Sequence, residues 1–348
     1  MKLRKRKYLA FLAGAALAWP VVDALLTLSI HRGFDPPRPH PFERGVWIIE
    51  RDLMSAREWH DFSHKYPIFL ALTWLFVTSG ATTTLPTDFN IFSNQFNAIG
   101  AGVPGSGGTT GVACVANGPG GNGGGAGAFA SIANYSAHGA GAVVNIQVGA
   151  GDTFFDSISV LLAKAGSGTT GGQASASVGS IKFNGGGGGA GGSGCAQVGS
   201  GGGGGGAGGP NGQGSTGGNG TIFVFSAATG GAGGNADGNT VGGGAGGTSS
   251  FPNGAVGSNG TEFGPNATSQ FAGCGGGGGG GASAAGAASP GGGGNSGAYG
   301  GGGGGGGGSG ASNPVPGGSG GNSFQGFIGY SYTPTVISGV RNFGFILG

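Results

Sequence analysis

Side chains that could carry out catalysis are few after residue 80 of this 348-residue chain. The carboxylates there are Asp88, Asp152, Asp156, Asp237 and Glu262. Asp152 and Asp156 lie close enough in sequence to suggest the acid–base pair of a glycosidase. However, the glycine and phenylalanine residues around them are typical of a turn that enters a strand. We therefore interpret both as turn aspartates.

Residue types that bind metals are equally sparse. His60 and His64 have the i, i+4 spacing of one helix face, but no third ligand accompanies them, which favours a solvated face. His138 is the only histidine after residue 80, and we interpret it as a loop residue. The three cysteines are Cys114, Cys195 and Cys274. They form neither a CxxC pair nor a disulfide framework.

Catalysis needs side chains that titrate, attack or coordinate. Their scarcity after residue 80 predicts a protein that is not an enzyme. The glycine runs also lack the following Lys-Ser/Thr of a phosphate-binding loop. We therefore expect no catalytic residue, no cofactor and no metal.

Glycine dominates the second half of the chain. The sequence contains 95 glycines, with long runs at 185–189, 201–206, 275–281 and 301–308. Glycine has no Cβ, so such runs cannot form a side-chain core, and ordering them costs much conformational entropy. Either this region is disordered, or its backbones pack as polyglycine II, an extended helix with three residues per turn and sideways hydrogen-bonding groups. We favour the ordered alternative because disordered chains are normally rich in charge, and this region is nearly uncharged.

Positive charge is concentrated at the N-terminus. The formal net charge is +2. Most of it comes from Lys2, Arg4, Lys5, Arg6 and Lys7. The rest of the chain offers no basic surface, so nucleic-acid binding is not expected. The apolar run 8–30 is typical of a signal peptide or a membrane anchor, with a buried or unstructured N-terminal helix as the alternative, and 31–71 predicts a linker and an amphipathic helix.

Segments with β-branched and aromatic residues predict a small antiparallel β framework in residues 72–184. We expect strands at 74–78, 95–99, 128–135, 143–148, 158–162, 180–183, 221–225, 327–332 and 336–347. The predicted fold class is mainly β. It adds a short helical N-terminal region, packed polyglycine II-type helices or glycine-rich loops in 185–324, and a closing β segment in 325–348.

Several motifs occur in a fixed order between residues 72 and 334. They include Trp74-Leu-Phe-Val-Thr-Ser-Gly80, Leu85-Pro-Thr-Asp-Phe-Asn90, Asn97-Ala-Ile-Gly-Ala-Gly102 and Gln325-Gly-Phe-Ile-Gly-Tyr-Ser-Tyr-Thr-Pro334. This order resembles a glycine-rich domain family of bacteriophage and prophage proteins, although Phe89 replaces a usual tryptophan and 1–71 matches nothing in that family. The resemblance implies a structural protein of the tail or tail fibre. By composition only, the chain is also similar to polyglycine II tail-fibre tip adhesins.

Bulkier residues interrupt the glycine-rich stretches at 249–253, 262–271 and 313–316. If these stretches are polyglycine II helices, the interruptions are expected to form exposed loops, and loops on a rigid scaffold commonly carry recognition. Plain solvated turns are the alternative interpretation. The candidate recognition residues are Phe251, Asn253, Phe263, Asn266, Phe271 and Asn313.

Together these features predict a non-enzymatic structural and recognition protein, tail-associated in a phage or prophage. Its expected partners are a host cell-surface glycan or protein and other tail proteins. The alternative is an exported bacterial surface or matrix adhesin. The expected location is therefore the virion tail or the extracellular surface; the sequence leaves open a membrane contact through 8–30 and a homo-oligomeric state.

Overall fold

The fold was obtained as a computed structural model. It describes residues 72–111, 118–193, 198–222, 228–238, 242–248, 253–261, 273, 275–276, 278–279, 289–310 and 315–335. The predicted N-terminal segment 1–30, the linker and helix in 31–71 and the strand at 336–347 lie outside the described residues. Within the described part of the chain, no helix is long and apolar enough to span a membrane.

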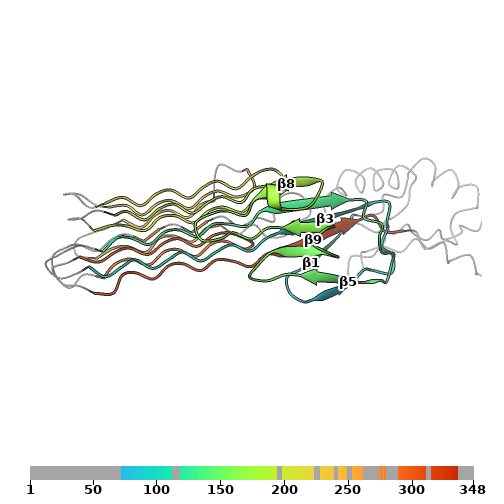
Figure 1. The fold of residues 1–348 in the computed structure, drawn as a ribbon, viewed down its shortest axis with the longest axis horizontal. Helices are drawn as coiled ribbons and strands as arrows, with labels where there is room; N and C mark the ends of the chain where they lie inside the picture. Colours follow the sequence, from blue (N-terminus) through green and yellow to red (C-terminus); the bar gives the residue numbers. More distant parts are fainter. Residues whose placement is uncertain are drawn as a thin grey trace, which may run out of the picture. The chain divides into compact units, whose positions relative to one another are not determined.

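The described strands form two antiparallel sheets (Figure 1), which confirms the prediction of a mainly β fold. The five-stranded sheet has the order β1 (Thr73–Val77), β9 (Phe327–Tyr332), β3 (Asn94–Ile99), β4 (Phe129–Ala133) and β8 (Ile181–Phe183). The four-stranded sheet has the order β2 (Thr82–Thr84), β5 (Val143–Gln147), β6 (Thr153–Phe155) and β7 (Leu161–Ala163). A short 3-10 helix, η2 (Ala174–Ala176), precedes β8.

Aromatic side chains join the two sheets. The ring of Phe96 in β3 stacks on Phe155 in β6 with 4.0 Å between centroids, and on Tyr330 in β9 at 4.8 Å. In β5, Val144 and Ile146 are buried while the residues between them are exposed, the alternation expected of a strand with one face on a core. The core therefore lies between the two sheets.

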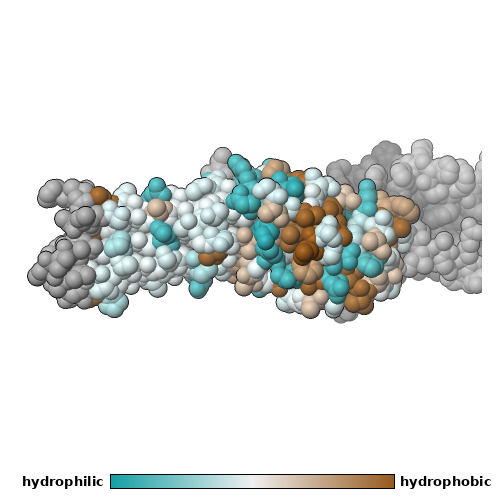
Figure 2. Space-filling model, in the orientation of Figure 1, coloured by the Kyte–Doolittle hydropathy of each residue, from teal (hydrophilic) through white to brown (hydrophobic). Residues whose placement is uncertain are grey.

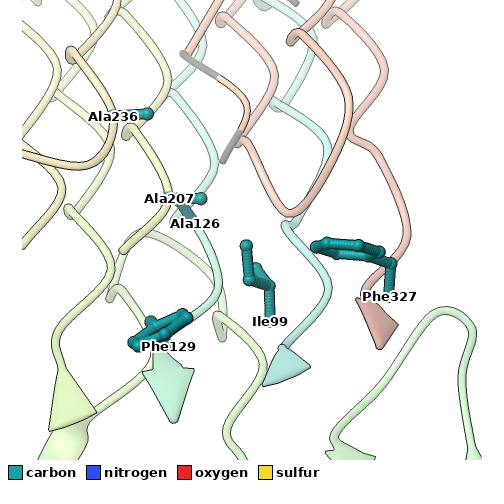
Figure 3. Packing of buried hydrophobic residues seen from close by; sticks show 6 residues of the cluster. All are labelled: Ile99, Ala126, Phe129, Ala207, Ala236 and Phe327. Carbon is teal, nitrogen blue, oxygen red and sulfur yellow. The ribbon is translucent and has the colours of Figure 1, made fainter. Parts of the chain in front are cut away.

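A second apolar cluster lies where the strands meet the glycine-rich segments. We call it the junction cluster, and its buried members are Ile99, Ala126, Phe129, Ala207, Ala236 and Phe327. Figure 3 shows the alanines on segments without strand structure and the larger residues beside strand ends. Among the described residues, the buried side chains that these segments contribute to the cluster are alanines, whose methyl groups fit the small space there.

The strands agree with the sequence prediction where the alternating pattern is long. β9 matches the predicted bounds, and β1, β3, β4, β5 and β8 differ from theirs by one to two residues. The prediction of a strand beginning at Ile158 was wrong, because Ile158 lies in a turn, is 63% exposed and precedes β7. β2 and β6 were not predicted, since three residues carry too short a pattern. Of 221–225, only 221–222 are described, and Ile222 forms an isolated bridge to Gly199.

The chain divides into two compact units. The two sheets and the junction cluster lie almost entirely in the unit of 74–87 and 91–331. The described part of the other unit is organised around Asp88. The Tyr332 hydroxyl donates to Asp88 Oδ1 at 2.8 Å, and the Thr335 N–H donates to the Asp88 carbonyl at 2.8 Å. Phe89 packs on Tyr332 with 5.5 Å between ring centroids. Asp88 thus acts as a structural acceptor in this unit.

Candidate functional site

The glycine-rich segments lie side by side and lead away from the strands of their unit (Figure 1). We call them the bundle, and its described segments lie within 100–111, 118–128, 184–193, 198–208, 213–222, 228–237, 242–248, 253–261, 273–279, 289–297, 301–310 and 315–324. Segments 100–111 and 118–128 fall inside the range that the sequence predicts as the β framework. Figure 2 shows a pale, weakly polar surface over the bundle, whereas teal and brown side chains gather over the strands.

Backbone hydrogen bonds join neighbouring segments with a period of three residues. Between segments 198–208 and 213–222, the donors recur every third residue. These bonds are Ser200 N to Thr221 O at 3.0 Å, Gly203 N to Gly218 O at 2.8 Å and Gly206 N to Ser215 O at 3.0 Å. The residue numbers rise on one side and fall on the other, so this pair is antiparallel.

Consecutive residues of one segment bond to different neighbours. Within 198–208, the N–H groups of Gly201, Gly202 and Gly203 donate to Gly279, Gly121 and Gly218 at 2.7, 2.9 and 2.8 Å. The carbonyls of the same three residues accept from Gly231, Gly305 and Gly189 at 2.9, 2.7 and 2.7 Å. Segment 198–208 is therefore surrounded by other segments on all sides. Segment 301–310 has a similar environment, with Gly302, Gly303 and Gly304 donating to Gly205, Val103 and Gly294.

No side chain fits between these central segments. A Cβ on Gly203 would lie 2.0 Å from the Ala232 carbonyl oxygen, and one on Gly204 would lie 2.0 Å from that of Gly302. Residues 201–206 and 301–308 are all buried. Two of the four long glycine runs of the sequence, 201–206 and 301–308, thus lie in segments enclosed on every side, which gives a steric reason for their composition.

The described residues that flank six connections lie at one end of the bundle, and the connections themselves, 112–117, 194–197, 223–227, 249–252, 280–288 and 311–314, lie outside the described residues. The described residues that flank them bond to one another. Gly118 N donates to Ser309 O at 2.8 Å, and Gly199 N donates to Gly118 O at 3.3 Å. Thr229 forms a bridge with Thr248, and Gly254 N donates to Ser289 O at 3.0 Å. We call this the distal end, because its flanking residues lie on the far side of the segments from the strands (Figure 1).

Most candidate recognition residues belong to connections whose described flanks lie at different ends of the bundle. Phe251 and Asn313 belong to connections at the distal end and lie outside the described residues. Phe263, Asn266 and Phe271 belong to 262–272, which is also outside them. Its flanking residues lie at the strand end: Gly273 N donates to Tyr299 O at 2.7 Å, and Tyr299 stacks on Phe327 of β9 at 4.9 Å.

Asn253 is the one candidate recognition residue within the described part of the chain. It is exposed at the distal end, and its Oδ1 accepts a hydrogen bond from Ser289 N at 3.0 Å. This amide therefore joins two segments of the bundle in addition to facing solvent.

The sequence did not indicate loops at 112–117, 194–197, 223–227 and 280–288, and it predicted a strand over 221–225. A signal was present in three of them, because apolar residues such as Val112, Cys195 and Phe223 interrupt glycine-rich sequence at these points. Each interruption follows a stretch of similar length, which is what a chain running out and back along one bundle requires. Connection 280–288 consists of small residues and carries no such signal.

Asp152 and Asp156 form ion pairs and hydrogen bonds that stabilise the local structure around β6. Asp152 forms an ion pair with Lys164 and accepts the Ala165 N–H at 2.9 Å. Asp156 accepts the Tyr135 hydroxyl at 2.9 Å and lies 3.3 Å from His138 Nε2. Asp152 precedes β6 and Asp156 follows it, so each carboxylate has its own set of partners.

Burial shifts the pKa values of Tyr135 and Asp237. Burial, and then the hydrogen bond and charge of Asp156, raise the pKa of the Tyr135 phenol. Burial also raises the pKa of Asp237, although hydrogen bonds from Asn211 and Gly212 oppose this. Asp237 is 1% exposed, and its two oxygens accept the Asn211 N–H at 2.6 Å and the Asn211 side-chain amide at 2.7 Å. It therefore fixes the turn between segments 198–208 and 213–222.

Within the described residues, no group of three His, Cys, Asp or Glu side chains is placed to hold a metal ion. The cysteines at 114, 195 and 274 lie outside the described part. No protein-family model and no curated protein sequence matches the chain. The resemblance to a phage protein family thus stays a prediction from the motifs alone.

Proposed function

We propose that this chain is a non-enzymatic structural and recognition protein, tail-associated in a phage or prophage, which uses a rigid glycine-rich bundle to hold binding loops. The observation that carries the proposal is that the described residues flanking six connections lie together at the distal end of the bundle. Loops that leave a rigid scaffold side by side form one continuous surface, and such loops are common binding sites.

In this proposal the segments of the bundle are polyglycine II helices. Hydrogen bonding with a period of three supports this assignment, because a helix with three residues per turn directs every third N–H to the same neighbour. The carbonyl approaches that exclude a Cβ also support it. Interhelical N–H···O bonds and close Cα–H···O contacts would then replace side-chain packing as the source of stability.

The sequence of the distal connections suits a binding surface. In sequence, connections 249–252 and 311–314 contain Phe251 and Asn313, and connection 223–227 contains Phe223 and Phe225. Aromatic rings with neighbouring amides contact sugars and protein surfaces well, since the ring provides apolar area and the amide provides directional hydrogen bonds. The proposed ligand is a host cell-surface glycan or protein.

The test is binding of the labelled full-length protein to whole cells of a panel of bacterial strains, measured by flow cytometry. A distal double variant, Phe251→Ala with Asn313→Ala, is compared with a matched variant of the strand-end connection, Phe263→Ala with Phe271→Ala. We expect the distal variant to lose most of its binding and the matched variant to keep it. Periodate or protease treatment of the cells then separates a glycan ligand from a protein ligand.

Equal binding by both variants would rule out the distal end as the recognition surface. A separate measurement addresses tail association: mass spectrometry of particles purified after prophage induction from a strain that encodes the chain. Recovery of the chain with tail proteins is expected. Recovery from the cell envelope alone would replace this proposal with the exported-adhesin alternative.

A further inference from the structure

Several asparagine side chains lie where a segment of the bundle lacks a neighbour. In segment 184–193, Gly188 N donates to the Thr169 carbonyl at 2.8 Å. One turn further out, Gly191 N donates instead to Asn122 Oδ1 at 2.9 Å. The asparagine side chain thus supplies the acceptor at the point where the backbone neighbour ends.

The same arrangement occurs beside it. Ala190 N of the same segment donates to Asn219 Oδ1 at 2.9 Å, and Gly243 N donates to Asn235 Oδ1 at 2.9 Å. A side-chain amide can accept from a backbone N–H in the same geometry as a peptide carbonyl does. These asparagines therefore imitate the carbonyl of a missing segment.

A third group forms a ladder across three neighbouring segments, 253–261, 289–297 and 315–324. Asn259 Oδ1 accepts from Asn295 N at 2.9 Å, and Asn295 Oδ1 accepts from Asn322 N at 2.9 Å. All three side chains are exposed. The ladder therefore lies on a side of the bundle that faces solvent.

Proline removes the donor at another edge. In segment 100–111, Gly102 and Gly105 donate to one neighbour, and Val103 and Ser106 donate to another. In a three-residue repeat the N–H groups point in three directions, and Pro104 occupies the position whose N–H would point in the third direction. Pro104 is exposed. Proline has no N–H and its fixed φ suits an extended helix, so no donor is left facing solvent there.

From these contacts we infer that the asparagine caps and the edge proline hinder lateral association of the bundle with a second copy of this chain. Open backbone N–H groups at the edge of a hydrogen-bonded array can pair with another chain, as they do at the edges of β-sheets. Asparagine caps and an edge proline occupy or remove these donors at the positions above. A second copy therefore finds fewer open donors along these edges. This inference is independent of what the distal connections bind.

The test compares two doubly substituted full-length proteins with the wild type. The cap variant, Asn259→Leu with Asn295→Leu, removes both acceptors of the ladder while keeping side-chain size. The matched variant, Ser258→Leu with Ser319→Leu, adds the same apolar groups at exposed positions of segments 253–261 and 315–324, and neither hydroxyl hydrogen-bonds to another residue within the described part of the chain. It therefore separates loss of a cap from gain of apolar surface.

Two quantities are measured: site-resolved hydrogen exchange at the amides of residues 295 and 322, and molecular mass by sedimentation velocity over a range of protein concentrations. In the cap variant we expect exchange at both amides to accelerate on the order of tenfold, because each loses one hydrogen bond. We also expect concentration-dependent association beyond that of the wild type. The matched variant is expected to change neither.

Unchanged exchange in the cap variant would show that the asparagine bonds do not protect these amides, and would overturn the inference. Faster exchange without association would overturn it as well, because the caps would then not be what keeps copies apart. Equal association of both variants would assign the effect to apolar surface alone. If the cap variant loses protection at 201–206, it has unfolded, and the single variant Asn259→Leu, read at residue 295, decides.

Discussion

At the scale of single residues, the bundle depends on positions where a hydrogen atom stands in place of a side chain. Gly204 is a clear case, because its Cβ would lie 2.0 Å from the Gly302 carbonyl oxygen. Real Cβ atoms do not approach an oxygen so closely, so an added methyl group must push two backbones apart and break the bonds between them.

We therefore predict that Gly204→Ala lowers the free energy of unfolding by about 3 kcal/mol or more, at or above the upper end of ordinary overpacking. Gly139→Ala is the control, since Gly139 is exposed and has nothing within 4 Å of its Cβ position. Chemical denaturation of both variants and the wild type gives the comparison. Similar denaturation midpoints for the two variants would contradict close backbone packing at Gly204.

A second prediction at this scale concerns Asp237. Burial raises the pKa of Asp237 above its usual 3.8, so the folded state holds the proton more tightly than the unfolded state does. Between 3.8 and the raised folded pKa, the free energy of unfolding therefore falls as the pH rises. Asp237→Asn removes this titration, and asparagine tolerates the positive φ of 56° at this position.

The stability of Asp237→Asn relative to the wild type is thus expected to increase as the pH rises through this window and to be constant outside it. Urea denaturation at a series of pH values measures the difference. Asp88→Asn, in the other unit, serves as a control for the loss of one carboxylate. A difference that stays flat with pH would mean that Asp237 is not destabilised by its burial.

The sequence alone predicted some of these single-residue features and missed others. A glycine run indicates a place where side chains are excluded, and the runs at 201–206 and 301–308 can be read directly from the sequence. The asparagine caps did not, because Asn122 and Asn295 look like ordinary polar residues among glycines. Their role depends on which backbone lies opposite, and glycine carries no side-chain pattern that identifies its neighbour.

At the scale of elements, strand prediction succeeded where two physical signals coincide. β3, β5 and β9 are five or six residues long and present buried side chains at alternating or continuous positions. β2 and β6 have three residues each, and their strand conformation depends on pairing with β5. Tertiary pairing of this kind leaves almost no local trace in a sequence.

The prediction for the elements concerns the junction cluster, where the bundle meets the sheets. Phe327 begins β9, is 1% exposed, and stacks on Tyr299 at 4.9 Å and on Phe76 at 6.1 Å. Phe327→Ala is expected to destabilise the protein by about 3–5 kcal/mol, because it leaves a cavity in the junction cluster. Val143→Ala in β5 is the control, since Val143 is 65% exposed and should change stability by no more than about 0.5 kcal/mol.

Thermal unfolding followed by circular dichroism checks both substitutions. If Phe327→Ala matched Val143→Ala, the junction cluster would contribute little to holding the strands and the bundle together. The glycine-rich segments would then have to be stable through their backbone contacts alone.

At the scale of the whole unit, the bundle is ordered from its centre outward. Segments 198–208 and 301–310 bond to neighbours in every direction, while segments such as 100–111 and 253–261 have an exposed side with serine, threonine, asparagine or proline. Composition therefore reports how deeply a segment lies, because only an exposed side has room for a side chain. It does not report which segments are adjacent, since glycine runs fit against one another in any register.

This order predicts a gradient of hydrogen exchange in the full-length protein. The amides of 202–205 are bonded to enclosed neighbours and can exchange only when several segments separate, so we expect them to be among the slowest in the chain. Amides of the exposed loop around Gly139 should exchange early. Mass spectrometry with site-resolved fragmentation measures both in one experiment. Fast exchange throughout 198–208 would mean that the segments do not hold one another, and the distal connections would then lack the rigid support on which the proposed recognition surface depends.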